Sequence, residues 1–146
     1  MELERIVASG LTNIYSLSTV QKEFRNSVNE TWKDEAPYPR YQKKLLQDLA
    51  VLEDLKEEAI TLPQFEKLTG EDRLYSIRHP RSQKNIRLLY TIEEGTIIIL
   101  LCAFLEKGTN DYKKAIAVAK KRLKWRDDNK YNISSQNTRR KPYEYY

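Results

Sequence analysis

Two arginines on neighbouring candidate strands are the clearest chemical signal in this chain. Arg78 lies in the stretch Leu74–His79, and Arg87 lies in the stretch Ile86–Ile92 that follows. A guanidinium group stays charged at physiological pH and donates paired hydrogen bonds that match phosphate oxygens. Side chains on adjacent strands can meet on one face of a sheet, so we expect these arginines to contact a phosphate group.

Three residues near the strand ends could assist chemistry at a phosphate. Lys107 follows an apolar run and would stabilise negative charge in a transition state, unless it is a plain turn lysine. His79 is the only histidine and titrates near neutrality, which suits a general acid or base, although a strand end is typical of a surface residue. Glu106 could act as a base or pair with Lys107.

The other assignments also have structural alternatives. Arg78 and Arg87 could be solvated at the surface or paired with Glu66 or Asp72, as arginines often are. Tyr90 could stack on a nucleic-acid base. It shares its alternating face with apolar residues of the same strand, so core packing suits it equally well.

Three strands must position these residues. The stretches Leu74–His79, Ile86–Ile92 and Ile97–Phe104 are separated by the turn-forming segments PRSQKN and EEG. Two short connections in succession predict an antiparallel meander. The third strand is apolar on both faces, which favours a central position with helices packed on one side and a partner or chain segment over the other.

Helices are predicted on both sides of this meander in the sequence. Before it, Asn13–Thr19 alternates as a strand does, residues 20–28 suggest a short helix, and a longer helix begins after Pro39. After it, the segment from Tyr112 to Lys124 has an apolar face and a lysine-rich face. The sequence therefore predicts an α+β fold, a small, mostly antiparallel β-sheet with N-terminal helices packed on one face and a C-terminal basic helix.

A chain of 146 residues has room for one domain and one core, which we place at residues 1–125. Residues 126–146 have almost no aliphatic side chains and are expected to form a basic, tyrosine-containing tail that is extended or disordered. Charge is segregated: Asp48–Asp72 has eight acids and two bases, whereas Lys120–Tyr146 has nine bases and three acids. The net charge of +5 therefore understates the attraction of the basic pole for anions.

Composition excludes several other classes of protein. Cys102 is the only cysteine and lies in an apolar run, so neither a disulfide framework nor a cysteine-based zinc site can form. That run is about half as long as a membrane-spanning helix requires. The acidic segment MELERIV lacks the basic start of a secretory signal. We therefore expect a cytoplasmic protein with no membrane association, no metal and no cofactor.

The strands carry an ordered series of short motifs. The first reads LYSIR from Leu74, the second reads IRLLY from Ile86, and the third runs into FLEKG from Phe104. This series resembles the RelE/HigB toxins, particularly their phage-derived branch, whose patterns are Leu-Tyr/Trp-Glu-Leu-Arg, Tyr-Arg-x-x-Tyr and Phe-x-Lys-Lys-Thr. Ser76 and Glu106 depart from these patterns, because the family has glutamate and lysine there. Outside residues 67–124 the resemblance is only in the order of elements.

The resemblance implies the toxin of a toxin–antitoxin pair, a hydrolase that cleaves messenger RNA in the ribosome and arrests growth. Many relatives use no metal, and the substrate's own 2′-hydroxyl attacks the adjacent phosphate, which requires cations, a base and an acid nearby. The catalytic candidates on this interpretation are Arg87, Arg78, Lys107, His79 and Glu106. The candidates for RNA binding are Lys67, Arg81, Tyr90, Lys120, Lys121 and Lys124. The implied partners are a cognate antitoxin, messenger RNA and the ribosome.

Two other functions fit the same resemblance. A ParE-like protein would inhibit DNA gyrase without catalysis and would tolerate the loss of Arg78, Arg87 and Lys107. An inactive relative would serve a phage or mobile element as a module that binds nucleic acid or a protein partner. The departures from the family patterns at Ser76 and Glu106 keep that last option open.

Overall fold

The computed structural model describes residues 1–31, 38–78 and 85–137 of the chain. In these residues six strands form one sheet in the order β1-β2-β6-β5-β4-β3. Neighbouring strands are antiparallel except β2 and β6, which are parallel. The strands are β1 (Leu3–Arg5), β2 (Ile14–Leu17), β3 (Phe65–Lys67), β4 (Tyr75–Arg78), β5 (Asn85–Glu93) and β6 (Ile97–Glu106). The helices are α1 (Val20–Thr31), α2 (Tyr38–Leu55), the 3₁₀ helix η1 (Lys56–Thr61) and α3 (Thr109–Asn137).

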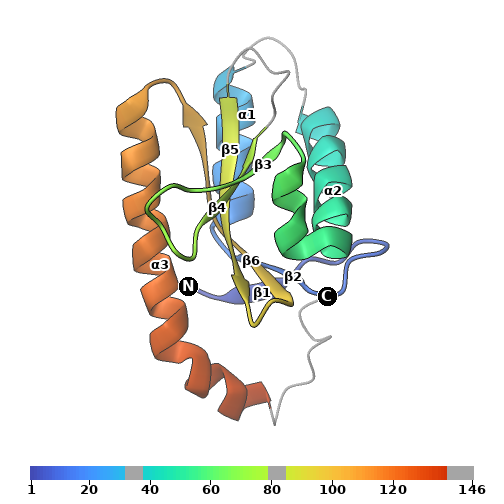
Figure 1. Ribbon diagram of the computed structural model, residues 1–146, viewed down its shortest axis with the longest axis vertical. Coiled ribbons are helices and arrows are strands. Elements are labelled where there is room, and N and C mark those ends of the chain that lie inside the picture. Colours follow the sequence, from blue (N-terminus) through green and yellow to red (C-terminus); the bar gives the residue numbers. More distant parts are fainter. Residues whose placement is uncertain (32–37, 79–84, 138–146) are drawn as a thin grey trace.

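Helices pack around the sheet. Figure 1 shows α3 on one side of the sheet and α2 on the other, with α1 behind the central strands. The predicted meander corresponds to β4, β5 and β6, so the α+β class, the mostly antiparallel sheet and the C-terminal helix are confirmed. None of the described helices has the length and hydrophobicity that a membrane span requires.

β6 is a central strand, and the core is built around it. Its residues Ile98–Leu101 are almost fully buried, because the strand is apolar on both faces. β6 pairs with β5 over its whole length, whereas its pairing with β2 stops at Leu100. In the described part of the chain, no strand lies beside the other edge of β6 beyond this residue.

An ion pair between two helices covers the start of this open edge. Arg122 of α3 donates to the carbonyl of Leu101 at 2.8 Å, and Glu23 of α1 accepts from the amide of Ala103 at 3.2 Å. The guanidinium and carboxylate groups also bind each other at 2.7 and 2.8 Å. These contacts satisfy backbone groups that an adjacent strand would otherwise bind. They also tie α1 to α3.

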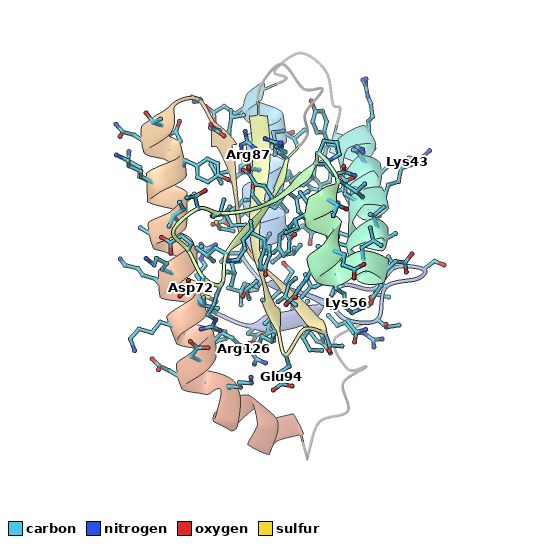
Figure 2. All side chains as sticks on the ribbon, viewed as in Figure 1. Lys43, Lys56, Asp72, Arg87, Glu94 and Arg126 are labelled. Atoms are coloured by element: carbon cyan, nitrogen blue, oxygen red, sulfur yellow. The ribbon has the colours of Figure 1, made fainter. Side chains whose placement is uncertain are left out.

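α3 is longer than the sequence predicts. Residues 126–137, expected to belong to an extended or disordered tail, continue the helix, and the rest of that tail lies outside the described residues. Arg126, which projects from the lower part of α3 in Figure 2, forms a buried ion pair with Glu93 of β5 at 3.1 Å. Asp127 binds Arg73 at 2.9 Å. Ion pairs dock Arg126 and Asp127, and such contacts leave no mark in hydrophobic periodicity.

The sequence also does not predict β1 and β3, which have three residues each. Three residues are too few for an alternating pattern to stand out. β3 nevertheless matters for the site, because it lies at the edge of the sheet beside β4. Its pairing with β4 places Glu66 opposite Ser76.

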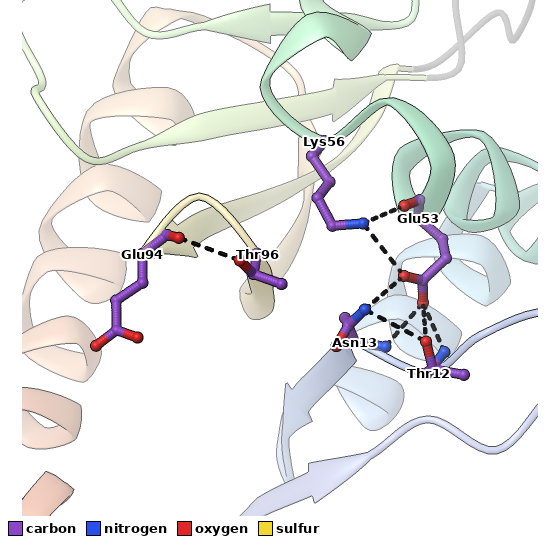
Figure 3. Close-up of polar contacts among 6 residues, drawn as sticks. All are labelled: Thr12, Asn13, Glu53, Lys56, Glu94 and Thr96. Carbon is purple, nitrogen blue, oxygen red and sulfur yellow. Dashed lines mark hydrogen bonds and ion pairs between the residues drawn. The ribbon is translucent and has the colours of Figure 1, made fainter.

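A buried carboxylate connects α2 to the segment before β2. Glu53 is only 7% exposed, and its carboxylate accepts the backbone N–H groups of Thr12 at 2.6 Å and Asn13 at 2.8 Å. The side chain of Asn13 adds a third hydrogen bond at 3.0 Å, and the ammonium group of Lys56 lies 3.5 Å away (Figure 3). Burial by itself would raise the pKa of Glu53, but these hydrogen bonds and the lysine charge outweigh it and lower the pKa.

The turn between β5 and β6 has an unusual backbone. Glu94 and Gly95 both have positive φ, at 54° and 69°, and the amide of Thr96 donates to the carbonyl of Glu93 at 3.0 Å. Two central residues with positive φ match the right-handed twist of a hairpin, but the first position suits asparagine better than glutamate. The hydroxyl of Thr96 donates to the carbonyl of Glu94 at 3.1 Å and supports the turn (Figure 3).

We expect acid to weaken the fold through Glu53. Because the folded-state pKa of this group lies below the ordinary value of 4.5, its contribution is present above that value and is lost as the pH falls through the folded-state pKa. Glu53→Gln should reduce the free energy of unfolding at neutral pH by about 1–3 kcal/mol and flatten its dependence on pH below 4.5. Urea denaturation over this range measures both effects. Asp54→Asn, which changes an exposed carboxylate on the same helix, is the control, and an equal loss in that variant would contradict the assignment.

Glu94→Asn should stabilise the protein by about 0.5–1 kcal/mol, because asparagine adopts the left-handed conformation at lower cost. Thermal or urea denaturation measures the change. The substitution also removes a 3.8 Å ion pair with exposed Lys130, so Glu94→Ala serves as the control for that contact. Equal stabilities of the two variants would show that the backbone at this position is not strained.

Candidate functional site

The structure brings together the two arginines that the sequence singles out. Arg78 of β4 and Arg87 of β5 are direct partners in the antiparallel register, so their side chains start on the same face of the sheet. That face is the one beneath α3, because Phe104, the β6 partner of Arg87, packs its ring against Tyr112 of α3 at 5.4 Å. The two arginines are thus neighbours across adjacent strands, and their contact with a phosphate stays a prediction.

Arg87 is largely withdrawn from solvent. Its side chain is 10% exposed, and its Nε atom binds the carboxylate of Glu106, the last residue of β6. The guanidinium carbon lies 5.5 Å from the centre of the Tyr112 ring. Its Nη1 atom is buried and has no hydrogen-bond partner among the described residues. A buried donor without a partner is costly, so this nitrogen has unused binding capacity.

Arg78 is more accessible, with 36% of its side chain exposed. Its Nε atom donates to the carbonyl of Pro63 at 2.8 Å, and its Nη1 atom lies 3.9 Å from the carboxylate of Glu66. The same carboxylate accepts a hydrogen bond from the hydroxyl of Tyr112 at 3.1 Å. Glu66 therefore connects the accessible arginine to the residue that covers the buried one.

Tyr112 keeps its proton at neutral pH. Burial raises the pKa of its hydroxyl to about 12, and the negative charge of Glu66 acts in the same direction. The hydroxyl of Ser76 and the charge of Arg87 partly offset this rise in pKa. The result is a phenol that donates to a carboxylate within a group of charged side chains. We call this group the arginine cluster, and its members are Glu66, Ser76, Arg78, Arg87, Glu106 and Tyr112.

Lys107 does not join the arginine cluster. Its ammonium group binds Glu30 of α1, which raises the pKa of the lysine. Lys107 is the first residue beyond the end of β6, next to Glu106. Of the two roles considered for Glu106, pairing with Lys107 is not found, because Glu106 binds Arg87 instead.

Tyr90 is a core residue. It is fully buried and stacks on Tyr75, with 5.2 Å between the ring centres. Burial raises the pKa of its hydroxyl. The prediction that this ring stacks on an RNA base is therefore wrong for this structure, and the alternative of core packing holds.

Three of the described lysines that are predicted to bind RNA contact groups of the protein itself. Lys67 donates to the carbonyls of Glu71 and Asp72, both at 2.8 Å, and so fixes the loop before β4. On α3, Lys120 pairs with Glu71 at 3.1 Å, and Lys124 pairs with Asp128 at 2.8 Å. Lys121 is exposed on the same helix. His79 and Arg81, the other predicted site residues, lie outside the described residues.

Sequence patterns predict no role in catalysis or binding for two members of the arginine cluster, Glu66 and Tyr112. From the sequence, Tyr112 is expected on the apolar face of a helix. Glu66 is expected only as a possible ion-pair partner of an arginine. The sequence around Glu66 does not indicate that this residue belongs to a site, because β3 is too short to be predicted as a strand. Knowledge of the β3–β4 register would have revealed Glu66, since it lies opposite Ser76.

The described residues offer few other reactive groups. No group of three potential metal ligands occurs among them. Burial raises the pKa of Cys102 to about 12, and its sulfur lies 3.7 Å from the carbonyl oxygen of Ala115 in α3. A thiol with this pKa has almost no thiolate at neutral pH. The arginine cluster is therefore the best candidate for chemistry in the described part of the chain.

A family model matches the region that carries this cluster. Residues 32–124, more than half of the chain, match the family described as Phage derived protein Gp49-like (DUF891). Neither the curated proteins nor the solved structures gave a significant match. The matched region runs from before α2 into α3, so every member of the arginine cluster lies within it.

We expect Cys102 to be inert in the folded protein. Iodoacetamide at neutral pH should modify it at least about a hundredfold more slowly than in urea, because the thiolate is the reactive form and burial suppresses it. Mass spectrometry of the modified protein measures both rates. Equal rates would mean that the thiol is accessible and that the packing of β6 against α3 is looser than described.

Proposed function

Because the chain belongs to the Gp49-like family of phage-derived proteins, a family of the toxin–antitoxin-associated RelE/HigB-like group, we propose that it is the toxin of a toxin–antitoxin pair. More specifically, it is a metal-independent endoribonuclease that cleaves messenger RNA at the ribosome. Growth arrest is the effect in the cell, and a cognate antitoxin is its protein partner.

The proposed reaction needs no external reactant. The 2′-hydroxyl oxygen of one nucleotide attacks the adjacent phosphorus and loses its proton to a base. The bond from phosphorus to the 5′-oxygen of the next nucleotide breaks, and that oxygen takes up a proton. The products are a 2′,3′-cyclic phosphate and a free 5′-hydroxyl. Catalysis requires cations beside the phosphate and groups that move two protons.

The arginine cluster contains groups suited to each of these tasks. Arg78 and Arg87 supply the positive charge that stabilises the phosphorane-like transition state. Glu66 is a half-exposed carboxylate that can accept the proton of the 2′-hydroxyl. Tyr112 retains its proton at neutral pH and donates to the leaving oxygen. His79 follows Arg78 in the chain and stays a candidate for either proton transfer.

One observation carries the proposal: two arginines are paired across adjacent strands with a carboxylate and a phenol on the same face. A protein that only binds gyrase does not need this arrangement. The lysines of α3, among them Lys121, would contribute contacts to the RNA backbone that salt weakens.

Arg87→Ala should reduce the cleavage of translated messages by about 10²–10³-fold, the effect of removing one donor to transition-state charge. Inducible expression followed by mapping of new RNA ends measures it. Arg87→Lys retains a positive charge for Glu106 but lacks the planar fork, so it should fold normally and still cleave poorly. Circular dichroism and the thermal midpoint establish that each variant is folded.

Arg73→Ala is the matched control, because it removes an arginine that is also held in an ion pair but lies outside the arginine cluster. This variant should cleave messages as the parent protein does. Retained cleavage in Arg87→Ala and Arg87→Lys would contradict the site. Growth arrest with DNA damage and intact messages would instead support inhibition of gyrase, and the absence of both effects would support a binding module.

A further inference from the structure

The charge of Arg87 is balanced by a residue that differs from the family pattern. Glu106 stands where the RelE/HigB pattern has a lysine, and its carboxylate binds the Nε atom of Arg87. The described contacts leave the Nη1 atom of this arginine without a partner. One carboxylate therefore covers part of a guanidinium group that could bind more than one oxygen.

A second buried ion pair, between Glu93 of β5 and Arg126 of α3, allows a comparison, because the Nη1 atom of Arg126 is likewise buried and without a hydrogen-bond partner among the described residues. Arg126 and Glu93 are bound by two hydrogen bonds, both 3.1 Å long, that use both carboxylate oxygens. The side chain of Glu93 is 6% exposed, whereas that of Glu106 is 23% exposed. Both arginine side chains are 10% exposed, so the difference lies in the acids. Glu93 is locked in place, and Glu106 is bound through one oxygen and reachable from solvent.

We propose that Glu106 is an internal substitute for a phosphodiester group, and that Arg87 forms an anion site which this carboxylate occupies until RNA displaces it. A carboxylate and a phosphodiester each carry one negative charge and present oxygens to a guanidinium group. The exchange therefore keeps one negative charge paired with the guanidinium group of Arg87. A phosphodiester has two nonbridging oxygens. One can replace the carboxylate oxygen at the Nε atom of Arg87, and the other can bind its unpaired Nη1 atom.

This inference rests on the proposed function and assigns Glu106 a role within it. Glu106 is then a regulatory contact and not the base that removes the proton of the 2′-hydroxyl, a task left to Glu66. The neighbouring Arg78 already has its own carboxylate partner, so displacement of Glu106 frees one arginine without disturbing the other.

The test measures binding separately from cleavage. The probe is a single-stranded DNA oligonucleotide, which has phosphodiester groups but no 2′-hydroxyl and so cannot react by the proposed route. Glu106→Gln should bind this probe at least about tenfold more tightly than the parent protein, which is the scale of one hydrogen bond to a charged group. Inorganic phosphate should also raise the thermal midpoint of Glu106→Gln more than that of the parent protein.

Glu93→Gln is the matched control, since it removes the same charge from an arginine of equal burial. Glu93→Gln should bind the oligonucleotide no more tightly than the parent protein does, and phosphate should not raise its thermal midpoint more than that of the parent protein. The double variant Arg87→Ala with Glu106→Gln should lose the increased affinity for the oligonucleotide. An equal gain in Glu93→Gln would reduce the effect to net charge, and no gain in Glu106→Gln would overturn the proposal.

Cleavage assays on RNA distinguish this proposal from the function on which it rests. Tighter binding by Glu106→Gln without cleavage by any variant would keep the anion site and reject the nuclease. Cleavage by the parent protein that Glu106→Gln abolishes, with no gain in binding, would keep the nuclease and make Glu106 the base.

Discussion

The partial exposure of one edge of β6 is the constraint on which the arrangement of helices depends. β2 is too short to cover this strand beyond Leu100, so backbone groups near the middle of the core lack a neighbouring strand. Arg122 and Glu23 bind these groups and each other, which holds α1 and α3 on either side of β6. Because α3 is held there, its first turn places Tyr112 over Arg87, and the arginine cluster has a cover.

Sequence patterns predict the parts of this molecule that depend on hydrophobic alternation. The β4–β5–β6 meander and the pairing of Arg78 with Arg87 follow from runs of strand-forming residues joined by short turns. Ion pairs leave no such pattern, which is why the second half of α3 and the direction of Lys107 were not predicted correctly. The partner of an exposed charge depends on elements distant in the sequence, as the contact between Lys107 and Glu30 illustrates.

In the described part of the chain, one ion pair joins the acidic region Asp48–Asp72 to the basic region that begins at Lys120. Glu71, from the acidic region, binds Lys120 of α3, and Arg73 binds Asp127 farther along the same helix. Surface pairs of this kind contribute only about 0–1 kcal/mol each, so they tune the position of the helix more than they hold it. The pair between Lys120 and Glu71 also offsets one positive charge of the basic region.

The parallel pairing of β2 with β6 also sets an order of events during synthesis. β5 and β6 form a local hairpin. β2 is synthesised early, but the strand with which it pairs in parallel, β6, follows more than eighty residues later. A ribosome that stops before β6 emerges releases a chain whose N-terminal strand has no place in a sheet. Copies of the chain that end before β6 thus lack the central strand that holds the cluster and its cover together, so on the proposed function such fragments have no assembled site.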